Sequence, residues 1–199
     1  IIHISDLHLG KGKRRNENVG CLLKKVSEQF KPDENTYLMV TGDLIDNWDP
    51  AKNAWKKQFK LAETSLGALG YKILVAPGNH DYAFGGFGFS TVYSDYFDDP
   101  FVRSLGIKHE FKAKLPWRLL LDDGQGSKVL VIGLNSCLMT ASPLDIAKGE
   151  IGDKQRKALD KILSEPDFKD VPKIVFLHHI PHRRAEGIGM SLIDYRELM

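Results

Sequence analysis

The sequence has few cysteines, no long apolar run and little excess of charge of either sign. Its two cysteines, Cys21 and Cys137, are too few for a disulfide framework, which favours a reducing compartment such as the cytoplasm. We expect both to be small buried hydrophobic residues. No stretch reaches the ~20 apolar residues of a membrane helix. No signal peptide is visible either, although the first residue is Ile and a removed targeting segment can precede it.

The balance of 28 Lys and Arg against 26 Asp and Glu argues against a protein that coats nucleic acid through its overall charge. A hydrophobic content of 42% and a charged content of 27% are ordinary globular values. They exclude disordered, collagen-like and coiled-coil proteins. The length of 199 residues suits one globular domain that folds without disulfides or a structural metal.

Apolar segments alternate with helical patterns in the first third of the chain. Short apolar runs predict strands at residues 1–4, 37–40 and 73–76. Between them, apolar residues recur every three or four positions over 19–30 and 55–69, which predicts two amphipathic helices. The order strand, helix, strand, helix, strand predicts a parallel sheet that is covered on both faces.

The rest of the chain is more varied. Eight aromatic residues fall between residues 82 and 101, where glycines predict a loop leading into a short helix. We expect this segment to pack against the protein, the alternatives being a substrate-pocket wall or a dimer contact. Turn signals separate three predicted strands with antiparallel pairing. A helix, a buried strand and a final helix follow. The three strands are expected at 107–111, 117–121 and 129–134, and the three later elements at 153–163, 173–177 and 191–199.

Four short polar groups directly follow four of the predicted strands. They are Asp6 with His8, Asp43 with Asp46, Asn79 with His80 and Asp81, and His178 with His179. Ligands of open α/β sheets bind at the carboxyl ends of the strands, so these side chains are expected to meet. Carboxylate oxygen, amide oxygen and imidazole nitrogen suit Mn, Fe or Zn. The sequence therefore predicts a metal site.

The ordered motifs D-x-H, G-D-x-x-D and G-N-H-D, followed by a His that ends a strand, resemble those of the calcineurin-like metallophosphoesterases. Asp6 and Asp43 are 37 residues apart and Asp43 and Asn79 are 36 apart, which in each case is about one strand and helix. The resemblance implies a four-layer αββα sandwich of two mixed sheets flanked by helices. It also implies a centre of two divalent metal ions, of which Mn, Fe and Zn are candidates.

The resemblance further implies a role for each motif residue. His80 would be the catalytic histidine, and Asp46 and Asp81 would orient the ligands and His80. The first metal would be bound by Asp6 and His8 and the second by Asn79 and His178, with Asp43 bridging both. The implied reaction is hydrolysis of a phosphomonoester or phosphodiester through attack by a metal-bridging hydroxide.

One family motif, G-H-x-H, is missing, and no histidine follows His182. We expect residues 1–199 to be most of a single catalytic domain whose last strand and metal-binding loop lie beyond the sequence. Each metal would then keep three protein ligands, so we expect weak metal binding and low activity. A non-catalytic scaffold of the same fold is the alternative. A nucleotide-binding domain is less favoured because no glycine-rich phosphate loop follows the first strand.

Two basic segments are expected beside the site, and they carry Lys13, Arg14 and Arg15, and Arg183 and Arg184. They predict attraction of an anionic substrate, the alternative being a solvated surface. The second and third motifs are similar to those of bacterial-type phosphodiesterases, which favours a phosphorylated small molecule or nucleotide as substrate. The run S-D-L-H-L-G also resembles Mre11/SbcD-like nucleases, but no second, DNA-binding domain is evident. The sequence does not indicate an oligomeric state.

Overall fold

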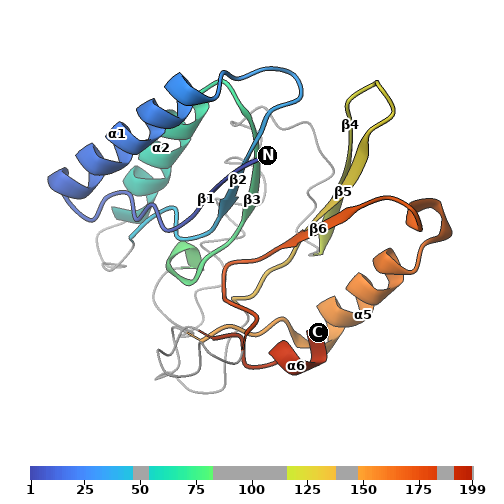
Figure 1. Cartoon of the computed structure of the whole chain (residues 1–199). Helices are drawn as coiled ribbons and strands as arrows, with labels where there is room; N and C mark the ends of the chain where they lie inside the picture. Colours follow the sequence, from blue (N-terminus) through green and yellow to red (C-terminus); the bar gives the residue numbers. More distant parts are fainter. Residues whose placement is uncertain (47–53, 83–115, 138–147, 183–190, 199) are drawn as a thin grey trace.

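The computed structural model describes residues 1–46, 54–82, 116–137, 148–182 and 191–198. In these ranges, two sheets of three strands each lie between helices (Figure 1). The first sheet contains β1 (Ile2–Ile4), β2 (Tyr37–Thr41) and β3 (Lys72–Ala76). Helices α1 (Lys13–Gln29) and α2 (Ala54–Gly67) fall between these strands in the sequence. The predicted strand and helix order of this half is confirmed.

The first sheet is parallel in its described part, with β2 between β1 and β3. In the register of the sheet, Ile4 lies opposite Val40 and Val40 lies opposite Val75. The carboxyl ends of all three strands therefore meet at one edge. This alignment brings the three segments that follow the strands to the same place.

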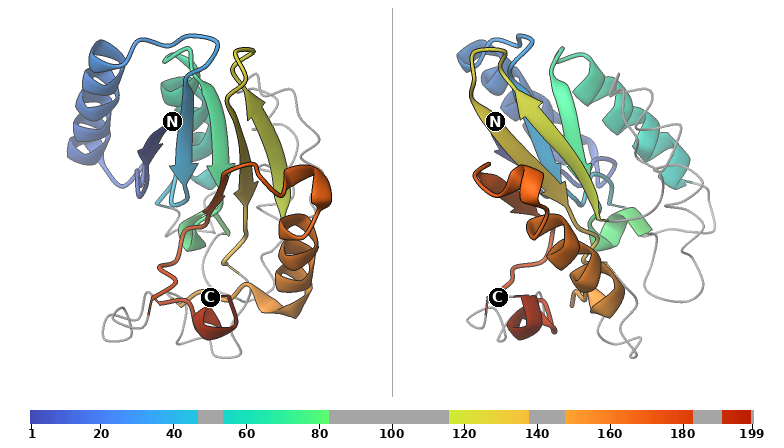
Figure 2. Two further views of the ribbon diagram at one scale, coloured as in Figure 1. Left: turned by 45° about the vertical axis from the view of Figure 1, so that its right-hand side comes forward. Right: turned by 90° about the vertical axis from the view of Figure 1, so that its right-hand side faces the viewer.

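Helices α1 and α2 cover one face of the first sheet (Figure 2). Val19 and Leu23 lie one turn apart in α1, and both are buried with the core residue Leu38 of β2. Phe59 of α2 joins the same cluster and has no exposed surface. Cys21, in contrast, is exposed, so the prediction that both cysteines are buried is wrong. Two residues along a helix turn the side chain by about 200°, which points Cys21 away from the face formed by Val19 and Leu23.

The second sheet contains β4 (Trp117–Asp122), β5 (Lys128–Gly133) and β6 (Lys173–Phe176). Strands β4 and β5 form an antiparallel hairpin, and β6 pairs in parallel with β5, so this sheet is mixed. Helix α5 (Gly152–Leu163) and the 3-10 helix η4 (Pro166–Phe168) precede β6. The antiparallel pairing of the predicted strands at 117–121 and 129–134 is confirmed. The predicted strand at 107–111, most of the aromatic segment, Arg183 and Arg184 lie outside the described residues.

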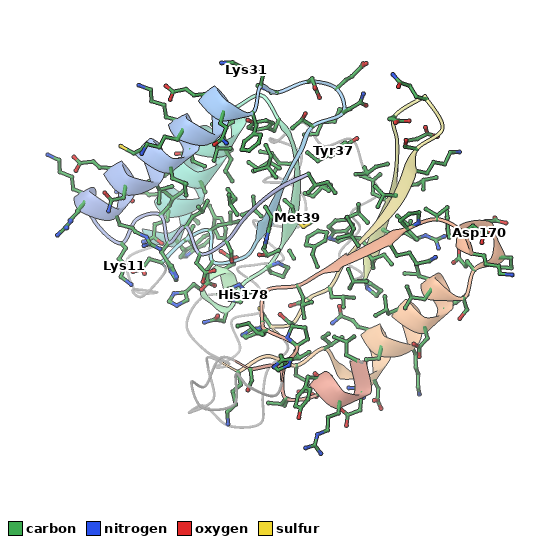
Figure 3. The ribbon with its side chains drawn as sticks, in the orientation of Figure 1. Lys11, Lys31, Tyr37, Met39, Asp170 and His178 are labelled. Atoms are coloured by element: carbon green, nitrogen blue, oxygen red, sulfur yellow. The ribbon has the colours of Figure 1, made fainter. Side chains whose placement is uncertain are left out.

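The two sheets pack face to face through apolar side chains. Met39 of β2 and Leu74 of β3 contact the same buried cluster as Trp117, Val131 and Phe176 of the second sheet. Figure 3 shows Met39 directed into the space between the two sheets. On the other side of the second sheet, a third cluster joins β5 to α5. The layers are therefore helix, sheet, sheet and helix, as the resemblance implies.

The predicted helix at 191–199 is wrong in its first part. Helix α6 spans only Tyr195–Leu198, because the preceding residues are extended and pair with two other segments. Ser191 pairs with Ile180 and Leu192 pairs with Gly149. The carboxylate of Asp194 holds this arrangement by accepting hydrogen bonds from the backbone N–H groups of residues 151 and 152. Within the described ranges, none of the helices is both long enough and apolar enough to cross a bilayer.

Candidate metal centre

The segments that follow β1 and β2 run side by side and are joined by backbone hydrogen bonds. The N–H groups of Asp6 and His8 donate to the carbonyl oxygens of Gly42 and Asp43 at 3.1 and 2.8 Å. Further along, Leu9 donates to Leu44 at 2.9 Å. These bonds continue the parallel pairing beyond the ends of the strands, so the D-x-H and G-D-x-x-D motifs are held in a fixed register.

Three motif residues have left-handed backbone conformations. Asp6, His8 and Asp43 have φ angles of 56°, 46° and 51°, and among the described residues no other non-glycine has a positive φ. Such conformations cost of order 1–3 kcal/mol each and persist only where the surroundings hold them, as they do at many functional sites. All three carry side chains that the sequence analysis assigns to a metal site.

Two glycines allow the second and third motifs to touch. A Cβ atom on Gly78 would lie 2.2 Å from the backbone nitrogen of Asp43, and a Cβ atom on Gly42 would lie 2.4 Å from the nitrogen of Gly78. Gly42 also has a φ of 81°, which favours glycine. The backbones approach so closely that neither position has room for a side chain.

Asp81 bonds the same two segments together. It lies in the 3-10 helix η2 (Asn79–Tyr82), and its side chain is fully buried. One carboxylate oxygen accepts from Leu44 N at 2.9 Å and Ile45 N at 3.3 Å, and the other accepts from Gly78 N at 2.8 Å. Burial, and then the neighbouring Asp43 carboxylate, raise the pKa of Asp81. Asp81 acts on the candidate ligands through the backbone of the two segments that carry them.

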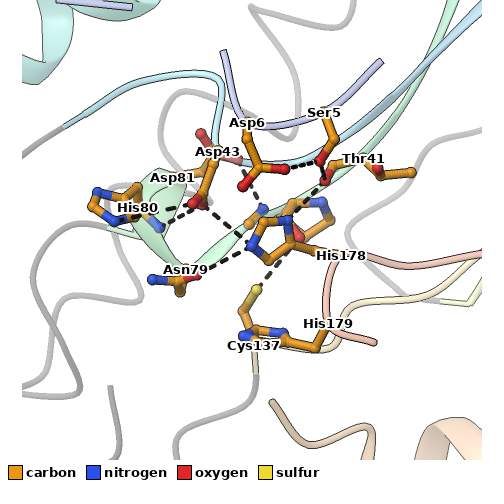
Figure 4. Close-up of polar contacts among 12 residues, drawn as sticks. Ser5, Asp6, Thr41, Asp43, Asn79, His80, Asp81, Cys137, His178 and His179 are labelled. Atoms are coloured by element: carbon orange, nitrogen blue, oxygen red, sulfur yellow. Dashed lines mark hydrogen bonds and ion pairs between the residues drawn. The ribbon is translucent and has the colours of Figure 1, made fainter. Parts of the chain in front are cut away.

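Figure 4 shows the carboxylate of Asp43 at the middle of the site, between His80 and His178. Its Oδ2 is 3.5 Å from His8 Nε2 and 4.0 Å from His80 Nε2, and its Oδ1 is 3.6 Å from His178 Nε2. These separations are too long for good hydrogen bonds. They are close to the ~3–3.5 Å that separates two ligands placed ~2.1 Å from one ion.

The hydrogen bonds of two histidines define which nitrogen faces the carboxylate. Nδ1 of His178 donates to the carbonyl of Thr41 at 2.8 Å, and Nδ1 of His80 donates to the carbonyl of Asp46 at 2.7 Å. Because a carbonyl can only accept, the proton of each neutral ring is on Nδ1 and the lone pair is on Nε2. In His8, burial lowers the pKa against the opposing effect of Asp43, which favours the neutral ring that binds metal.

Two groups of side chains could each hold one ion, and they share Asp43. One group is His8, Asp43 and His80, and the other is Asp6, Asp43 and His178; in each, the ligand atoms lie within 4.8 Å of one another. Asn79 adjoins the second group, with Oδ1 3.2 Å from His178 Nε2. The structure thus brings together all the side chains predicted as metal ligands, together with His80. It groups His8 with His80, whereas the resemblance pairs His8 with Asp6.

The family model for calcineurin-like phosphoesterases matches residues 1–196. The chain belongs to the calcineurin-like phosphoesterase family. Its fold is also similar to that of a dimetal phosphatase from Danio rerio, with a TM-score of 0.63 and 14% sequence identity, over 98% of this chain and 74% of that chain. The predicted fold and family are therefore confirmed.

The residues of this calcineurin-like phosphoesterase fit a divalent cation at the centre. The Nε2 lone pair of His178 faces two oxygen acceptors, those of Asn79 at 3.2 Å and Asp43 at 3.6 Å. Acceptors that face one another repel unless a proton or a cation lies among them. The donor set is nitrogen and oxygen, which suits Mn, Fe or Zn. The nearby Cys137 thiol donates to the Pro77 carbonyl at 3.3 Å, and burial raises its pKa, which disfavours the thiolate form.

The predicted basic residues take different positions. Lys13 and Arg14 are exposed in the first turn of α1. Arg15 is half-buried, and its guanidinium donates to the carbonyls of Leu7 and Asp6 at 3.0 and 2.5 Å. Substrate binding by these residues stays a prediction. Nothing in the sequence separates Arg15 from its two basic neighbours, because its contact depends on where α1 begins.

Several residues that are not among the predicted metal ligands also lie beside the site. Lys11 Nζ lies 3.3 Å from the Asp46 carboxylate, whose other neighbour is His8 Nδ1 at 3.6 Å. The Ser5 hydroxyl contacts the Asp6 carboxylate and the Thr41 carbonyl. Ser5 and Lys11 flank the D-x-H motif, and this adjacency was the available signal. Thr41 contributes through its backbone carbonyl, which no side-chain pattern predicts.

Proposed function

We propose that this protein hydrolyses phosphoester bonds at a centre of two divalent metal ions, whose ligands are Asp6, His8, Asp43, Asn79 and His178. The observation that carries the proposal is the position of Asp43, whose two oxygens face imidazole nitrogens that reach it from three other strand ends. Membership of the calcineurin-like phosphoesterase family supports a metal-dependent phosphoesterase.

Asp43 has the geometry that a shared ligand needs. Its Oδ2 faces His8 and its Oδ1 faces His178, so the two oxygens point towards different candidate ligand groups. A carboxylate between two cations also reduces their mutual repulsion. Two bound ions would supply an activated water and stabilise the negative charge of the phosphoryl oxygens. The hydrogen bonds of His178 to the Thr41 carbonyl and of Asp81 to the Asp43 segment hold these ligands in place for that chemistry.

His80 is proposed as the group that handles a proton at the leaving oxygen. Its Nδ1 is fixed by the Asp46 carbonyl at 2.7 Å, so Nε2 is the nitrogen that gains or loses a proton. The side chain is 18% exposed, which allows contact with a substrate. Proton donation to the leaving oxygen from this position would contribute roughly 10²–10⁴-fold in rate.

The proposed substrate is anionic, and a phosphodiester of nucleotide type is preferred. The G-D-x-x-D and G-N-H-D motifs support this choice, as do the exposed Lys13 and Arg14 in the first turn of α1. Hydrolysis of bis-p-nitrophenyl phosphate, p-nitrophenyl phosphate, a cyclic nucleotide and single-stranded DNA would separate a diesterase from a monoesterase and from a nuclease.

The function is tested by steady-state kinetics of the purified chain with Mn²⁺ on these substrates. We expect slow hydrolysis that stops when EDTA is added, because each metal keeps only three of its ligands in this chain. Asp43→Asn and His80→Asn should each lower kcat by at least ~100-fold, since one removes a shared ligand and the other a proton donor. Asp170→Asn is the matched control, because it removes an exposed carboxylate far from the site (Figure 3). Activity of Asp43→Asn within a factor of two of the parent would contradict the proposal.

A further inference from the structure

We propose that Arg15 is a positioning residue, which holds the ligands Asp6 and His8 in place from outside the metal centre. The inference rests on the proposed function, because it assumes that these two side chains bind metal. Arg15 lies in the first turn of α1, and its guanidinium donates from Nε to Leu7 O at 3.0 Å and from Nη2 to Asp6 O at 2.5 Å.

The two carbonyls belong to the most strained part of the D-x-H segment. Asp6 and His8 are left-handed on either side of Leu7. The N–H groups of Asp6 and His8 donate to the carbonyl oxygens of Gly42 and Asp43 in the segment that follows β2. Arg15 therefore supplies donors to the carbonyls of a segment whose amides are already bonded elsewhere.

The form of the guanidinium explains why an arginine suits this position. Nε–H and one Nη2–H lie along one edge of a rigid plane, so their directions are fixed relative to each other. Two successive carbonyls that accept from this edge are fixed in the same way. Because Asp6 supplies one of the two carbonyls and His8 follows the other, the contact limits the directions of both candidate ligands.

Arg15 extends from a helix whose position is fixed by other contacts. Val19 and Leu23 of the same helix are buried in the core. The next residue, Asn16, accepts a hydrogen bond through Oδ1 from the N–H of Gly10 at 2.8 Å. The start of α1 is thus bonded to the segment at both of its ends, by Arg15 at residues 6 and 7 and by Asn16 at residue 10.

The competing role is the one expected from sequence, in which Arg15 attracts substrate together with Lys13 and Arg14. The two roles predict different measurements. A positioning residue changes the affinity for metal when no substrate is present. A residue that attracts substrate leaves metal affinity unchanged and alters KM in a way that weakens at high salt.

The test is titration calorimetry of the 199-residue chain with Mn²⁺, without substrate. We expect Arg15→Met to raise the Kd of the more tightly bound Mn²⁺ ion by roughly 10–100-fold, which is the usual effect of removing a group that orients metal ligands. Arg15→Lys keeps the charge but loses the paired donors, so it should lie between Arg15→Met and the parent. Lys25→Met removes one positive charge from the exposed side of the same helix and should match the parent.

The outcomes separate this inference from the proposed function. If Asp43→Asn binds Mn²⁺ with the same Kd as the parent, the proposal that Asp43 belongs to a metal centre is wrong. If Asp43→Asn loses binding while Arg15→Met keeps the parental Kd, the metal centre stands and the role of Arg15 is wrong. A parental Kd with a KM that depends on salt would also overturn it, in favour of substrate attraction. Should circular dichroism show that Arg15→Met is unfolded, the Kd of Arg15→Lys decides between the same outcomes.

Discussion

The Asp81 side chain is bonded on both of its oxygens, and all three donors are backbone N–H groups. Two belong to the segment after β2 and one to the segment after β3. A buried carboxylate that joins two segments in this way does not need to touch a metal ion to affect it. Asp81 therefore also limits the position of Asp43, because Asp43 immediately precedes Leu44, whose N–H group is one of the three donors.

We expect Asp81→Asn to lower the free energy of unfolding by about 1–3 kcal/mol. The amide keeps one acceptor oxygen but places an NH₂ group against a backbone N–H. Urea unfolding in EDTA measures the effect. Asp170→Asn, which changes an exposed carboxylate, should stay within about 0.5 kcal/mol of the parent. Equal losses in both variants would contradict the role assigned to Asp81.

The pH dependence of this difference has a defined sign. Burial and Asp43 raise the pKa of Asp81 above its ordinary value of 3.8. Between the ordinary and the raised pKa, the folded chain holds a proton that the unfolded chain has lost, so this carboxyl stabilises the fold less as the pH rises. The advantage of the parent over Asp81→Asn should therefore shrink as the pH is raised above the ordinary value of 3.8.

Many of the side chains in the site could be predicted, but their conformations could not. Asp43 and His80 each follow an apolar strand of the first sheet, and its parallel register brings these two positions together. His178 follows β6 of the second sheet and reaches the same place because the two sheets pack face to face. The left-handed backbone of Asp6 and His8 could not be predicted, because aspartate and histidine adopt it more often than most residues but still in only a small minority of cases. Their φ angles result from bonds to Gly42 and Asp43, which are distant in sequence.

At the scale of elements, the segments after β2 and β3 touch through glycine. We expect Gly78→Ala to destabilise the protein by more than about 2 kcal/mol, because its Cβ would lie 2.2 Å from the Asp43 backbone nitrogen and from its Oδ1. The displaced Asp43 should also bind Mn²⁺ less tightly. Thermal unfolding and Mn²⁺ titration measure the two effects.

Gly20→Ala is the control for this substitution. Gly20 lies inside α1, and a Cβ atom there would meet nothing within 4 Å. Alanine in a helix is more favourable than glycine, so this variant should gain roughly 0.5–1 kcal/mol and keep its affinity for Mn²⁺. A Gly78→Ala variant that behaves like Gly20→Ala would show that the two segments can separate without cost.

Elements with strong periodicity were predicted well, whereas the last helix was not. The apolar spacing of Phe59 and Leu66 reports burial against the sheet, and both side chains are fully buried. Residues 191 and 192 also suit a helix locally, yet they pair with Ile180 and Gly149. Asp194 then bonds the same segment to the backbone of Gly152. A contact between residues so far apart in the chain outweighs local preference, and a single sequence does not reveal it.

At the scale of the molecule, the candidate ligands come from both sheets. Asp6, Asp43 and Asn79 follow strands of the first sheet, and His178 follows β6 of the second. His178 also donates to the Thr41 carbonyl at 2.8 Å, which bonds the two sheets directly. Ions held by both sets of ligands would oppose separation of the sheets.

Metal binding should therefore stabilise the whole fold. A concentration of Mn²⁺ at ~100 times its Kd should add about 2.7 kcal/mol to the free energy of unfolding. For a chain of this length, that is a rise in Tm of several degrees. Differential scanning fluorimetry with Mn²⁺ and with EDTA measures the shift, and Asp43→Asn should abolish it. A shift of equal size in Asp43→Asn would mean that Mn²⁺ binds elsewhere.

The number of residues between Thr41 and His178 also determines how long after Thr41 the ribosome adds His178. Their hydrogen bond joins residues that are 137 positions apart. At ~5–20 residues per second, a ribosome adds His178 roughly 7–30 seconds after Thr41. By the end of that interval Asp6, His8, Asp43 and Asn79 have all been synthesised, but the imidazole from the second sheet has not yet been added. The nascent chain therefore passes through a stage in which the other candidate ligands are present without His178, and the proposed centre can be complete only after His178 has been added.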